Sequence, residues 1–269
     1  MSGAQQRPLA FVTGASSGIG LCYARALAAR GWDLVIGGRR VERLDALARE
    51  LTGAGARAET VVADLATAEG LAAHEAICRD RPLDLLVNNA AVAHYMPFAK
   101  LPADKLDELL QVNTVAVVKL ARAAVEGMVT RGRGAILNVA SQLAFSGAAK
   151  LPALPARVIY ASTKAFLVAF SQLLAAELEG TGVKVQVVCP GVVVSEFHSR
   201  QGIDMSGRPR LPAEELVRGS LADLDAGVLV SLPTLEEPAV FDEIAAAQGK
   251  LLGQSLKPTL ASRYGREGS

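Results

Sequence analysis

The stretch LAFVTGASSGIG, residues 9–20, decides the fold. Its apolar and β-branched start predicts a short buried strand, and the residues after it have the periodicity of a helix. Glycines at positions 14, 18 and 20 form the connection. Such a turn lets the backbone approach a pyrophosphate, and the helix N-terminus offers free N–H donors. The stretch predicts a dinucleotide-binding turn, the alternative being a glycine-rich turn without a ligand.

The same alternation of strand and helix continues along the chain. Strands are predicted at 9–14, 33–38, 59–64, 83–89, 134–140 and 183–190, with a seventh at 227–232. Helices are predicted at 20–31, 41–51, 68–80, 103–132 and 160–180. This order predicts an α/β fold, a doubly wound Rossmann-type parallel sheet of about seven strands with helices on both faces. We expect a single domain over residues 1–269.

Composition excludes several classes of partner. The chain is 51% hydrophobic and 20% charged with a net charge of +1, which favours neither nucleic acid nor an anionic membrane surface. No apolar stretch of spanning length or signal peptide is evident, so a soluble cytoplasmic protein is expected. Cys22, Cys78 and Cys189 lack metal-ligand spacing and are expected to be buried free thiols, with no bound metal.

The end of the second predicted strand indicates which cofactor binds. An acidic residue commonly contacts the ribose 2′-hydroxyl at this position, whereas arginine accommodates a 2′-phosphate. This chain has Gly37 and Gly38 followed by Arg39 and Arg40, which favours NADP(H). The alternative is that both arginines belong to a solvated helix start.

Tyr160 and Lys164 are four positions apart and would share one helix face. A cation beside a phenol favours the phenolate, so the pair could act as acid and base. The spacing alone is a weak signal, but the pair follows the fifth strand, at the edge where α/β sheets bind ligands.

The chain resembles the short-chain dehydrogenase/reductase family in motifs that occur in order over about residues 8–195. They are TGASSGIG at 13–20, ADL at 63–65, NNA at 88–90, Asn113, NVAS at 138–141, YASTK at 160–164 and PGVVVS at 190–195.

The resemblance implies four catalytic residues. Ser141 would hydrogen-bond the substrate oxygen, and Tyr160 would transfer the proton. Lys164 would lower the pKa of Tyr160 and hold the nicotinamide ribose. Asn113 would bind a water that connects Lys164 to solvent, unless it only kinks its helix.

The resemblance also implies the cofactor contacts. Asp64 and Leu65 would flank the adenine, with a helix cap as the alternative for Asp64. Asn89 would face the ribose side, and Val193 and Ser195 would anchor the carboxamide. The complete predicted cofactor set is Gly14, Ser16, Ser17, Gly18, Ile19, Gly20, Arg39, Arg40, Asp64, Leu65, Asn89, Ala90, Tyr160, Lys164, Pro190, Gly191, Val193 and Ser195.

Two departures from the family pattern bear on the site. Ala91 stands where the family usually has glycine after NNA. Ser141 and Tyr160 are separated by about six more residues than usual, so an insertion at about 142–159 must loop out. Ser146 is nearer to Tyr160 in sequence, but Ser141 has the matching strand context and is assigned the role.

The predicted function is an NADP(H)-dependent oxidoreductase that interconverts a secondary alcohol and a ketone or aldehyde. A nicotinamide-binding sensor without turnover is the alternative. A sugar-nucleotide epimerase or dehydratase would need a different glycine spacing and a longer C-terminal domain. The resemblance, and two helices apolar on more than one face, predict a homodimer or homotetramer.

A hydrophobic small-molecule substrate is expected from two segments that would form the pocket wall. The first is the insertion, with Leu143, Phe145, Leu151, Leu154 and Val158 as apolar contributors and Pro152 and Pro155 as stiffening residues. The second is a substrate loop at about 192–212 that would act as a lid. His94, Tyr95 and His198 are open candidates for substrate contact, whereas His74 is expected to be an ordinary helix residue.

Overall fold

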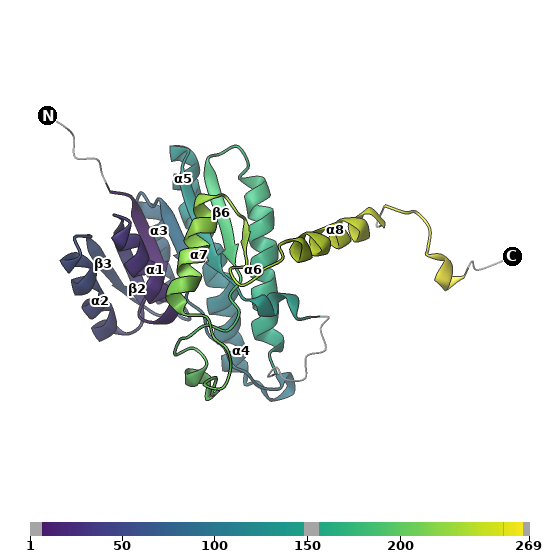
Figure 1. Cartoon of the computed structure of the whole chain (residues 1–269), viewed down its shortest axis with the longest axis horizontal. Coiled ribbons are helices and arrows are strands. Elements are labelled where there is room, and N and C mark those ends of the chain that lie inside the picture. Colours follow the sequence, from purple (N-terminus) through teal and green to yellow (C-terminus); the bar gives the residue numbers. More distant parts are fainter. Residues whose placement is uncertain (1–6, 148–155, 255, 266–269) are drawn as a thin grey trace. The chain divides into compact units, whose positions relative to one another are not determined.

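The computed structural model describes residues 7–147, 156–254 and 256–265. Its centre is a seven-stranded parallel sheet in the order β3-β2-β1-β4-β5-β6-β7 (Figure 1). The strands are β1 Leu9–Thr13, β2 Asp33–Gly38, β3 Ala58–Val62, β4 Leu85–Asn88, β5 Gly134–Val139, β6 Val183–Val188 and β7 Val230–Ser231. The predicted fold class is confirmed.

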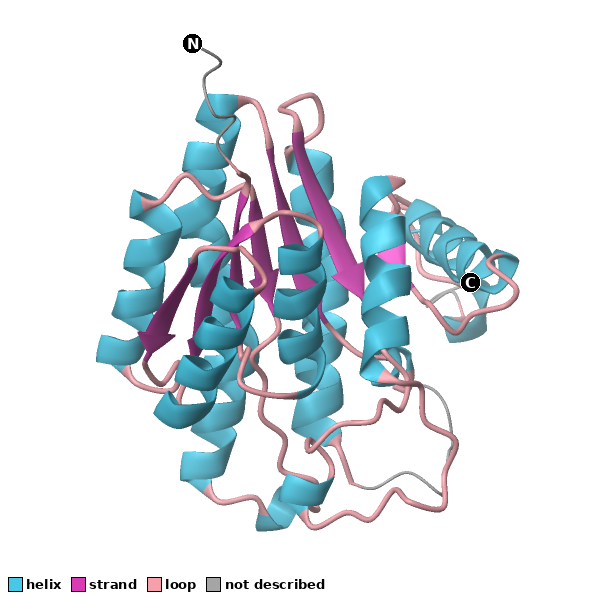
Figure 2. Ribbon diagram, turned by 60° about the vertical axis from the view of Figure 1, so that its left-hand side comes forward, coloured by secondary structure: helices cyan, strands magenta, loops and turns pink. Residues whose placement is uncertain are grey.

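Helices cover both faces of the sheet (Figure 2). They are α1 Gly18–Ala29, α2 Val41–Gly53, α3 Ala68–Asp80, α4 Ala103–Leu110, α5 Ala116–Arg131, α6 Val158–Glu177 and α7 Ala213–Asp225. Short 3-10 helices occur at Phe98–Lys100, Gln142–Phe145 and Ser199–Gln201.

Alternation along each strand sends side chains into two cores. In β1, Ala10 and Val12 pack with α1, α2 and α7, whereas Phe11 packs on the opposite face with α3 and α5. Because both faces are covered, the central strands are continuous apolar runs rather than alternating ones.

Buried polar side chains tie helices to the strands. Asn88 donates to Asn138 across β4 and β5 at 2.9 Å, and Asn138 donates to Ser171 of α6 at 2.9 Å. On the other face, the Tyr23 hydroxyl donates to Ser220 at 2.6 Å. Buried polar groups need such partners, so these contacts fix α6 on the sheet and α1 against α7.

The predicted helix at 103–132 is interrupted. Between α4 and α5 the residues Gln111–Val115 form a π-helical turn, and Asn113 lies in it with no exposed surface. The helix α7 was not among the sequence-based predictions. The three cysteines are buried and form no disulfide.

Among the described residues, one helix, α6, has the length and the apolar composition that crossing a membrane would require. It packs on β5, β6 and α4 and buries Lys164 and Ser171. Those contacts are typical of a core helix in a folded domain.

The chain up to Pro233 forms one compact unit, and Thr234–Ser269 form a second one. The second unit contains α8, Ala239–Gln254, and a 3-10 helix at Ser262–Tyr264. Among its described residues Leu251, Leu256 and Leu260 are largely exposed. A single domain over the entire chain stays a prediction.

Candidate active site

A cavity of about 870 Å³ opens at the carboxyl ends of β1, β2, β4, β5 and β6. Of the predicted site residues, all but Gly20 and Asn113 line it. Parallel sheets of this kind bind ligands at this edge. The structure therefore brings together residues from position 14 to position 195 in one cavity.

The glycine turn between β1 and α1 requires its glycines. Gly14 and Gly18 have positive φ of 67° and 56°, where side chains are strained. A Cβ on Gly14 would lie 2.9 Å from the Cα of Ala90, and one on Gly20 would collide with the Asn89 amide. The glycines thus let the turn pack directly against Ala90 and Asn89. The start of α1, whose N-cap residue Ser17 makes no side-chain capping bond, leaves N–H donors as a cradle that fits a pyrophosphate.

Asn89 holds this turn against β4. Its side-chain amide donates to the carbonyl of Thr13 at 2.8 Å, and the Thr13 hydroxyl accepts from the backbone N–H of Asn89 and of Ala90, both at 3.0 Å. Asn89 therefore has a direct positioning role that the sequence did not reveal.

The two arginines after β2 have different partners. Arg40 donates to the Ser16 hydroxyl through Nε and Nη2, at 3.1 and 2.9 Å, and to the Ser17 hydroxyl at 2.7 Å. Arg39 is half exposed and pairs with Asp64 at 3.3 Å. Arg40, which contacts the glycine turn, is therefore not part of a solvated helix face.

Asp64 shapes the loop after β3 rather than capping α3. One of its carboxylate oxygens accepts from the N–H of Ala66 at 3.0 Å, and the helix cap is Thr67, whose hydroxyl accepts from Gly70 at 3.0 Å. Asp64 and the buried Leu65 both line the cavity.

His74 of α3 is also buried beneath the cavity. Its Nδ1 lies 2.7 Å from the carbonyl of Gly70, and its ring stacks on Phe11. A Cβ on Gly37 would lie 2.8 Å from its Nε2, so β2 needs a glycine at that position.

Ser141, Tyr160 and Lys164 meet at the end of β5, and all three are buried. The Ser141 hydroxyl accepts from the N–H of Leu143 at 3.2 Å. Burial, followed by the neighbouring Tyr95, raises the pKa of Tyr160 well above its ordinary value, and Ser141 opposes this with a smaller lowering effect. Tyr160 is therefore protonated at neutral pH.

Lys164 donates to the carbonyl of Val139 at 2.8 Å, and its Nζ lies 5.7 Å from the centre of the Tyr160 ring. Burial lowers the pKa of Lys164 to about 8. Its ammonium group is not among the causes that shift the pKa of Tyr160 in this structure, because it faces the ring and the β5 carbonyl. The predicted lowering of the Tyr160 pKa by Lys164 stays a prediction.

Ser146 has other partners than Tyr160. Its hydroxyl donates to the carbonyl of Leu143 at 2.8 Å and accepts from Arg157 at 3.2 Å. These contacts favour Ser141 as the serine that serves Tyr160.

Asn113 lies behind the cavity and braces the loop after β4. Its side chain accepts from the N–H of Val92 at 3.0 Å and donates to the carbonyl of Val92 at 2.9 Å. It also donates to Thr163 of α6 at 3.3 Å. The π turn therefore aims one amide at both the loop and the helix of Tyr160.

Four aromatic residues that line the cavity contact one another and form what we call the aromatic wall: Tyr95, Tyr160, Phe197 and His198. The ring of Tyr160 lies 5.4 Å from that of Tyr95 and 5.8 Å from that of Phe197, and Tyr95 stacks on His198 at 6.3 Å. Phe197 was missed by the sequence reasoning, although it lies in the predicted substrate loop.

Not every candidate for the wall reaches the cavity. His94 is turned to Glu108, with 2.9 Å between Nε2 and the carboxylate. In the insertion, Leu143 and Phe145 line the cavity, whereas Val158 is more than half exposed and does not. Leu151, Pro152, Leu154 and Pro155 lie outside the described residues.

The segment after β6 closes the cavity from the other side. Val193 pairs with Leu211, and the N–H of Leu211 donates to the carbonyl of Val192 at 2.9 Å. A Cβ on Gly18 would lie 3.1 Å from that of Ser195, so this segment lies directly against the glycine turn.

Fold and site together define a Rossmann-type protein with a cavity that fits a dinucleotide and a serine–tyrosine–lysine group beside it. The family model described as short chain dehydrogenase matches residues 8–205. The chain belongs to the short-chain dehydrogenase family, and it is an oxidoreductase that acts on CH–OH groups with a nicotinamide cofactor. The family expected from the sequence motifs is confirmed.

Relatives and solved structures agree with this assignment. The chain is 40% identical to L-xylulose reductase of Mus musculus over 187 residues, 69% of this chain and 72% of the relative. It is 37% identical to a short-chain dehydrogenase from Sphingobium yanoikuyae in complex with NADPH, with a TM-score of 0.90 over 96% of this chain and 100% of that one. A bulky-bulky ketone specific alcohol dehydrogenase from Comamonas testosteroni is 32% identical, with a TM-score of 0.86 over 96% and 99%.

Proposed function

We propose that this oxidoreductase interconverts a secondary alcohol and a ketone or aldehyde, and that it prefers NADP(H) to NAD(H). The observation that supports it most is that Ser141, Tyr160 and Lys164, all buried, line the same cavity. Two hydroxyls that converge in an apolar cavity are suited to one carbonyl oxygen.

The chain's own residues bind the substrate oxygen and move its proton. When it is bound, nicotinamide supplies or accepts the hydride. The hydroxyls of Ser141 and Tyr160 hold the substrate oxygen, and in the reducing direction Tyr160 donates its proton to that oxygen. The raised pKa of Tyr160 suits a proton donor at neutral pH.

The residues that would hold the cofactor extend along the cavity. The turn from Gly14 to Gly20 would bind the pyrophosphate, and Asp64 with Leu65 would flank the adenine. Lys164 would contact the nicotinamide ribose, and Val193 with Ser195 would anchor the carboxamide. Asn113 is proposed to bind a water beside Lys164 in addition to its contacts with Val92 and Thr163.

Preference for NADP(H) is supported by the end of β2. Gly37 and Gly38 leave no carboxylate there, and Arg40 with Ser16 lines the cavity at the same place. A charge-assisted contact with a 2′-phosphate is worth about 1.5 to 3 kcal/mol, roughly 10- to 150-fold in affinity. Titration by cofactor fluorescence should show NADPH bound more tightly than NADH.

The variant Gly38→Asp tests the origin of that preference. A Cβ on Gly38 meets only ordinary contacts, with the Ser16 hydroxyl at 3.5 Å, so the side chain is accommodated. Its carboxylate should repel a 2′-phosphate and move the preference toward NADH. Gly38→Asn, which has the same shape without the charge, is the control. Equal effects of both variants would reject the electrostatic explanation.

The aromatic wall supports a hydrophobic substrate. Tyr95, Phe197 and His198 line the cavity together with Leu143 and Phe145, and the rings of Tyr95 and Phe197 contact the ring of Tyr160. Ring faces bind flat apolar groups well. A panel of aromatic and aliphatic ketones with NADPH, followed by nicotinamide absorbance, should show the highest kcat/KM for aromatic ketones. No turnover of any carbonyl or alcohol would favour the sensor alternative.

A further inference from the structure

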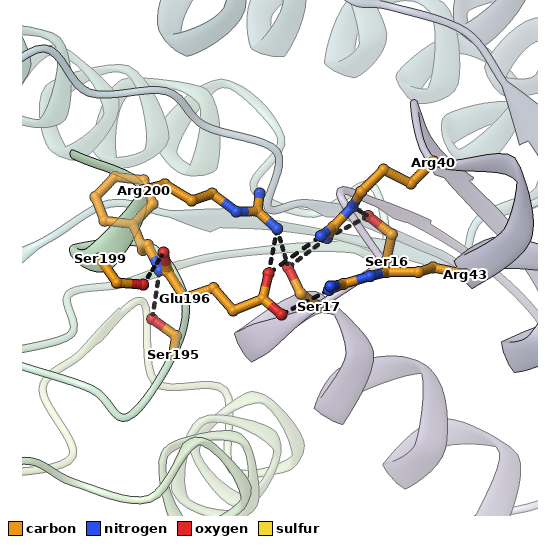
Figure 3. Close-up of polar contacts among 9 residues, drawn as sticks. Ser16, Ser17, Arg40, Arg43, Ser195, Glu196, Ser199 and Arg200 are labelled. Carbon is orange, nitrogen blue, oxygen red and sulfur yellow. Dashed lines mark hydrogen bonds and ion pairs between the residues drawn. The ribbon is translucent and has the colours of Figure 1, made fainter. Parts of the chain in front are cut away.

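Glu196 lies among three arginines from separate parts of the chain (Figure 3). Its carboxylate accepts from Arg43 at 2.6 Å, from Arg40 at 3.1 Å and from Arg200. Arg40 and Arg43 are at the start of α2, whereas Glu196 and Arg200 belong to the segment after β6. We refer to Glu196, Arg40, Arg43 and Arg200 as the arginine cluster.

The arginine cluster is continuous with the glycine turn. Arg40 also binds the hydroxyls of Ser16 and Ser17, and Arg200 donates to Ser17 at 3.4 Å. Ser16, Ser17, Arg40 and Arg200 line the cavity. Two of the three arginines that hold Glu196, Arg40 and Arg200, therefore also face this end of the cavity, whereas Arg43 does not line it.

Arg40 has most of its donors engaged by the protein. Its Nε and Nη2 reach the two serines, and its Nη1 reaches Glu196. A second anion that binds Arg40 through these same groups takes N–H donors from Glu196 or from the serines. The two serine hydroxyls are neutral and the Glu196 carboxylate is negatively charged. A phosphate at this place therefore repels Glu196 directly.

The net positive charge of the arginine cluster favours binding of such an anion. Three guanidinium groups face one carboxylate, an excess of two positive charges that matches a phosphate dianion. Hydrogen bonds from Arg43 and Arg200 lower the pKa of Glu196 to about 2, so its negative charge persists throughout the neutral range. The competition therefore operates at working pH.

We propose that Glu196 competes with the 2′-phosphate of the cofactor for Arg40 and Arg200, and thereby limits how strongly the protein selects NADPH over NADH. The proposal rests on the proposed NADP(H) preference and adds to it a residue that opposes that preference. Glu196 is thus a specificity-determining residue that lies outside the family motifs found in the sequence.

The test compares Glu196→Gln with the wild-type protein in calorimetric titrations with adenosine 2′,5′-bisphosphate and with AMP. These probes differ in the 2′-phosphate alone. We expect the variant to bind the bisphosphate about 3- to 10-fold more tightly, because three surface ion pairs no longer compete with it, and to bind AMP unchanged. NADPH and NADH titrations should show the same contrast.

Glu50→Gln is the matched control. Glu50 is a half-exposed carboxylate bound by Arg25 at 2.7 and 2.8 Å, and it does not line the cavity. Its replacement changes the net charge of the protein by the same amount and should leave binding of both probes unchanged.

Three results would overturn the proposal: unchanged bisphosphate binding in Glu196→Gln, weaker binding, or equal tightening for AMP. Weaker binding would mean that Glu196 organises the arginines for the phosphate. If Glu196→Gln does not fold, as judged by circular dichroism, Glu196→Asp replaces it. Its shorter side chain should tighten bisphosphate binding by a smaller factor, and no tightening would again overturn the proposal.

Failure of the proposed function gives a different result. Wild-type protein would then bind NADH as tightly as NADPH. The comparison of Glu196→Gln with wild type on the two adenosine probes would still decide whether Glu196 competes for the arginines.

Discussion

Tyr160 and Lys164 are both buried, and burial moves their pKa values in opposite directions because one group is neutral and the other charged when protonated. Tyr160 is held as a phenol, and Lys164 is brought to a pKa of about 8. A substitution of Tyr160 therefore tests its role as a proton donor, and a substitution of Lys164 tests whether its pKa is lowered in the folded protein.

Replacing Tyr160 by phenylalanine removes the proposed proton donor and keeps the ring. We expect turnover to fall at least about 100-fold, the lower end for acid–base catalysis, while NADPH binding changes little. Steady-state kinetics and cofactor fluorescence measure the two effects. Turnover close to that of the wild type would remove Tyr160 from the mechanism.

Burial of Lys164 gives a pH-dependent stability. Below pH 8 Lys164 is charged in both the folded and the unfolded protein, so the free-energy cost of burying its charge is fully present. Above pH 10.5, the ordinary pKa of lysine, it is neutral in both states and that cost is absent. Lys164→Met should therefore be more stable than wild type at pH 7, by about 1 to 3 kcal/mol. The difference in the free energy of unfolding between the variant and the wild type should decrease as the pH rises from 8 to 10.5.

Urea unfolding at pH 7 and pH 10 measures this gap. The variant also loses the hydrogen bond to Val139, which reduces the gain equally at both pH values. A difference that does not change with pH would show that Lys164 has no lowered pKa in the folded protein.

At the scale of elements, the π turn between α4 and α5 places Asn113 where a regular helix would not. Its side chain satisfies both the N–H and the carbonyl of Val92. A π turn within an α-helix often marks a functional site. Here it ties the loop that carries Tyr95 to the helix that carries Tyr160.

Asn113→Ala should leave those part-buried backbone groups without partners, at a cost of about 1 to 3 kcal/mol in the free energy of unfolding. Thr114→Ala, in the same π turn but exposed, is the control and should cost less than about 0.5 kcal/mol. Equal effects in urea unfolding would mean that the turn itself, and not the Asn113 amide, stabilises the loop.

The segment from Ser195 to Gln201 has side chains for two tasks. Glu196 faces the arginines, while Phe197 and His198 form part of the aromatic wall. Phe197→Ala should raise KM for aromatic ketones several-fold, because a ring contact is worth about 0.5 to 1.5 kcal/mol beyond its buried area. His94→Ala, whose side chain faces Glu108, should leave KM unchanged. Similar KM changes in both would argue against the wall.

At the scale of the whole molecule, the predicted oligomer has a candidate surface on α6. Phe166 and Leu173 are 42% and 66% exposed there, and Val129 of α5 is 40% exposed. Apolar helix faces that the protomer does not cover are typical of subunit interfaces. We propose a dimer or tetramer in which these helices meet those of a second copy.

Leu173→Glu should shift the protein toward monomer in light scattering at micromolar concentration. Val62→Glu, which changes an exposed apolar residue of β3, is the control and should leave the mass unchanged. A wild-type protein that is already monomeric would contradict the oligomer prediction.

Sequence patterns predicted those parts of the molecule that depend on neighbours along the chain. The strands, the glycine turn and the Tyr160–Lys164 spacing follow from local periodicity, and the structure has seven strands within the segments predicted for them or one residue from those segments. The break at Asn113 was expected only as an alternative, a helix kink, because its contact with Val92 lies on another segment and leaves no local pattern.

Contacts between distant residues were missed for the same reason. Arg43, Glu196 and Arg200 are ordinary surface residues in sequence, and they meet only because the segment after β6 folds back on α2. Phe197 lacks a local pattern, and its place beside Tyr160 depends on the pairing of Val193 with Leu211. The helix α7 was overlooked although its apolar residues recur at helical spacing.

The strand order has a consequence for synthesis of the chain. After β1 and β2, each new strand joins an outer edge of the existing sheet, and none must insert between earlier ones. The turn from Gly14 to Gly20 and its brace Asn89 are therefore complete once β4 has left the ribosome. At about 5 to 20 residues per second, Tyr160 and Lys164 follow roughly 4 to 15 s later. A nascent chain would acquire the dinucleotide cradle well before it acquires the residues proposed for catalysis.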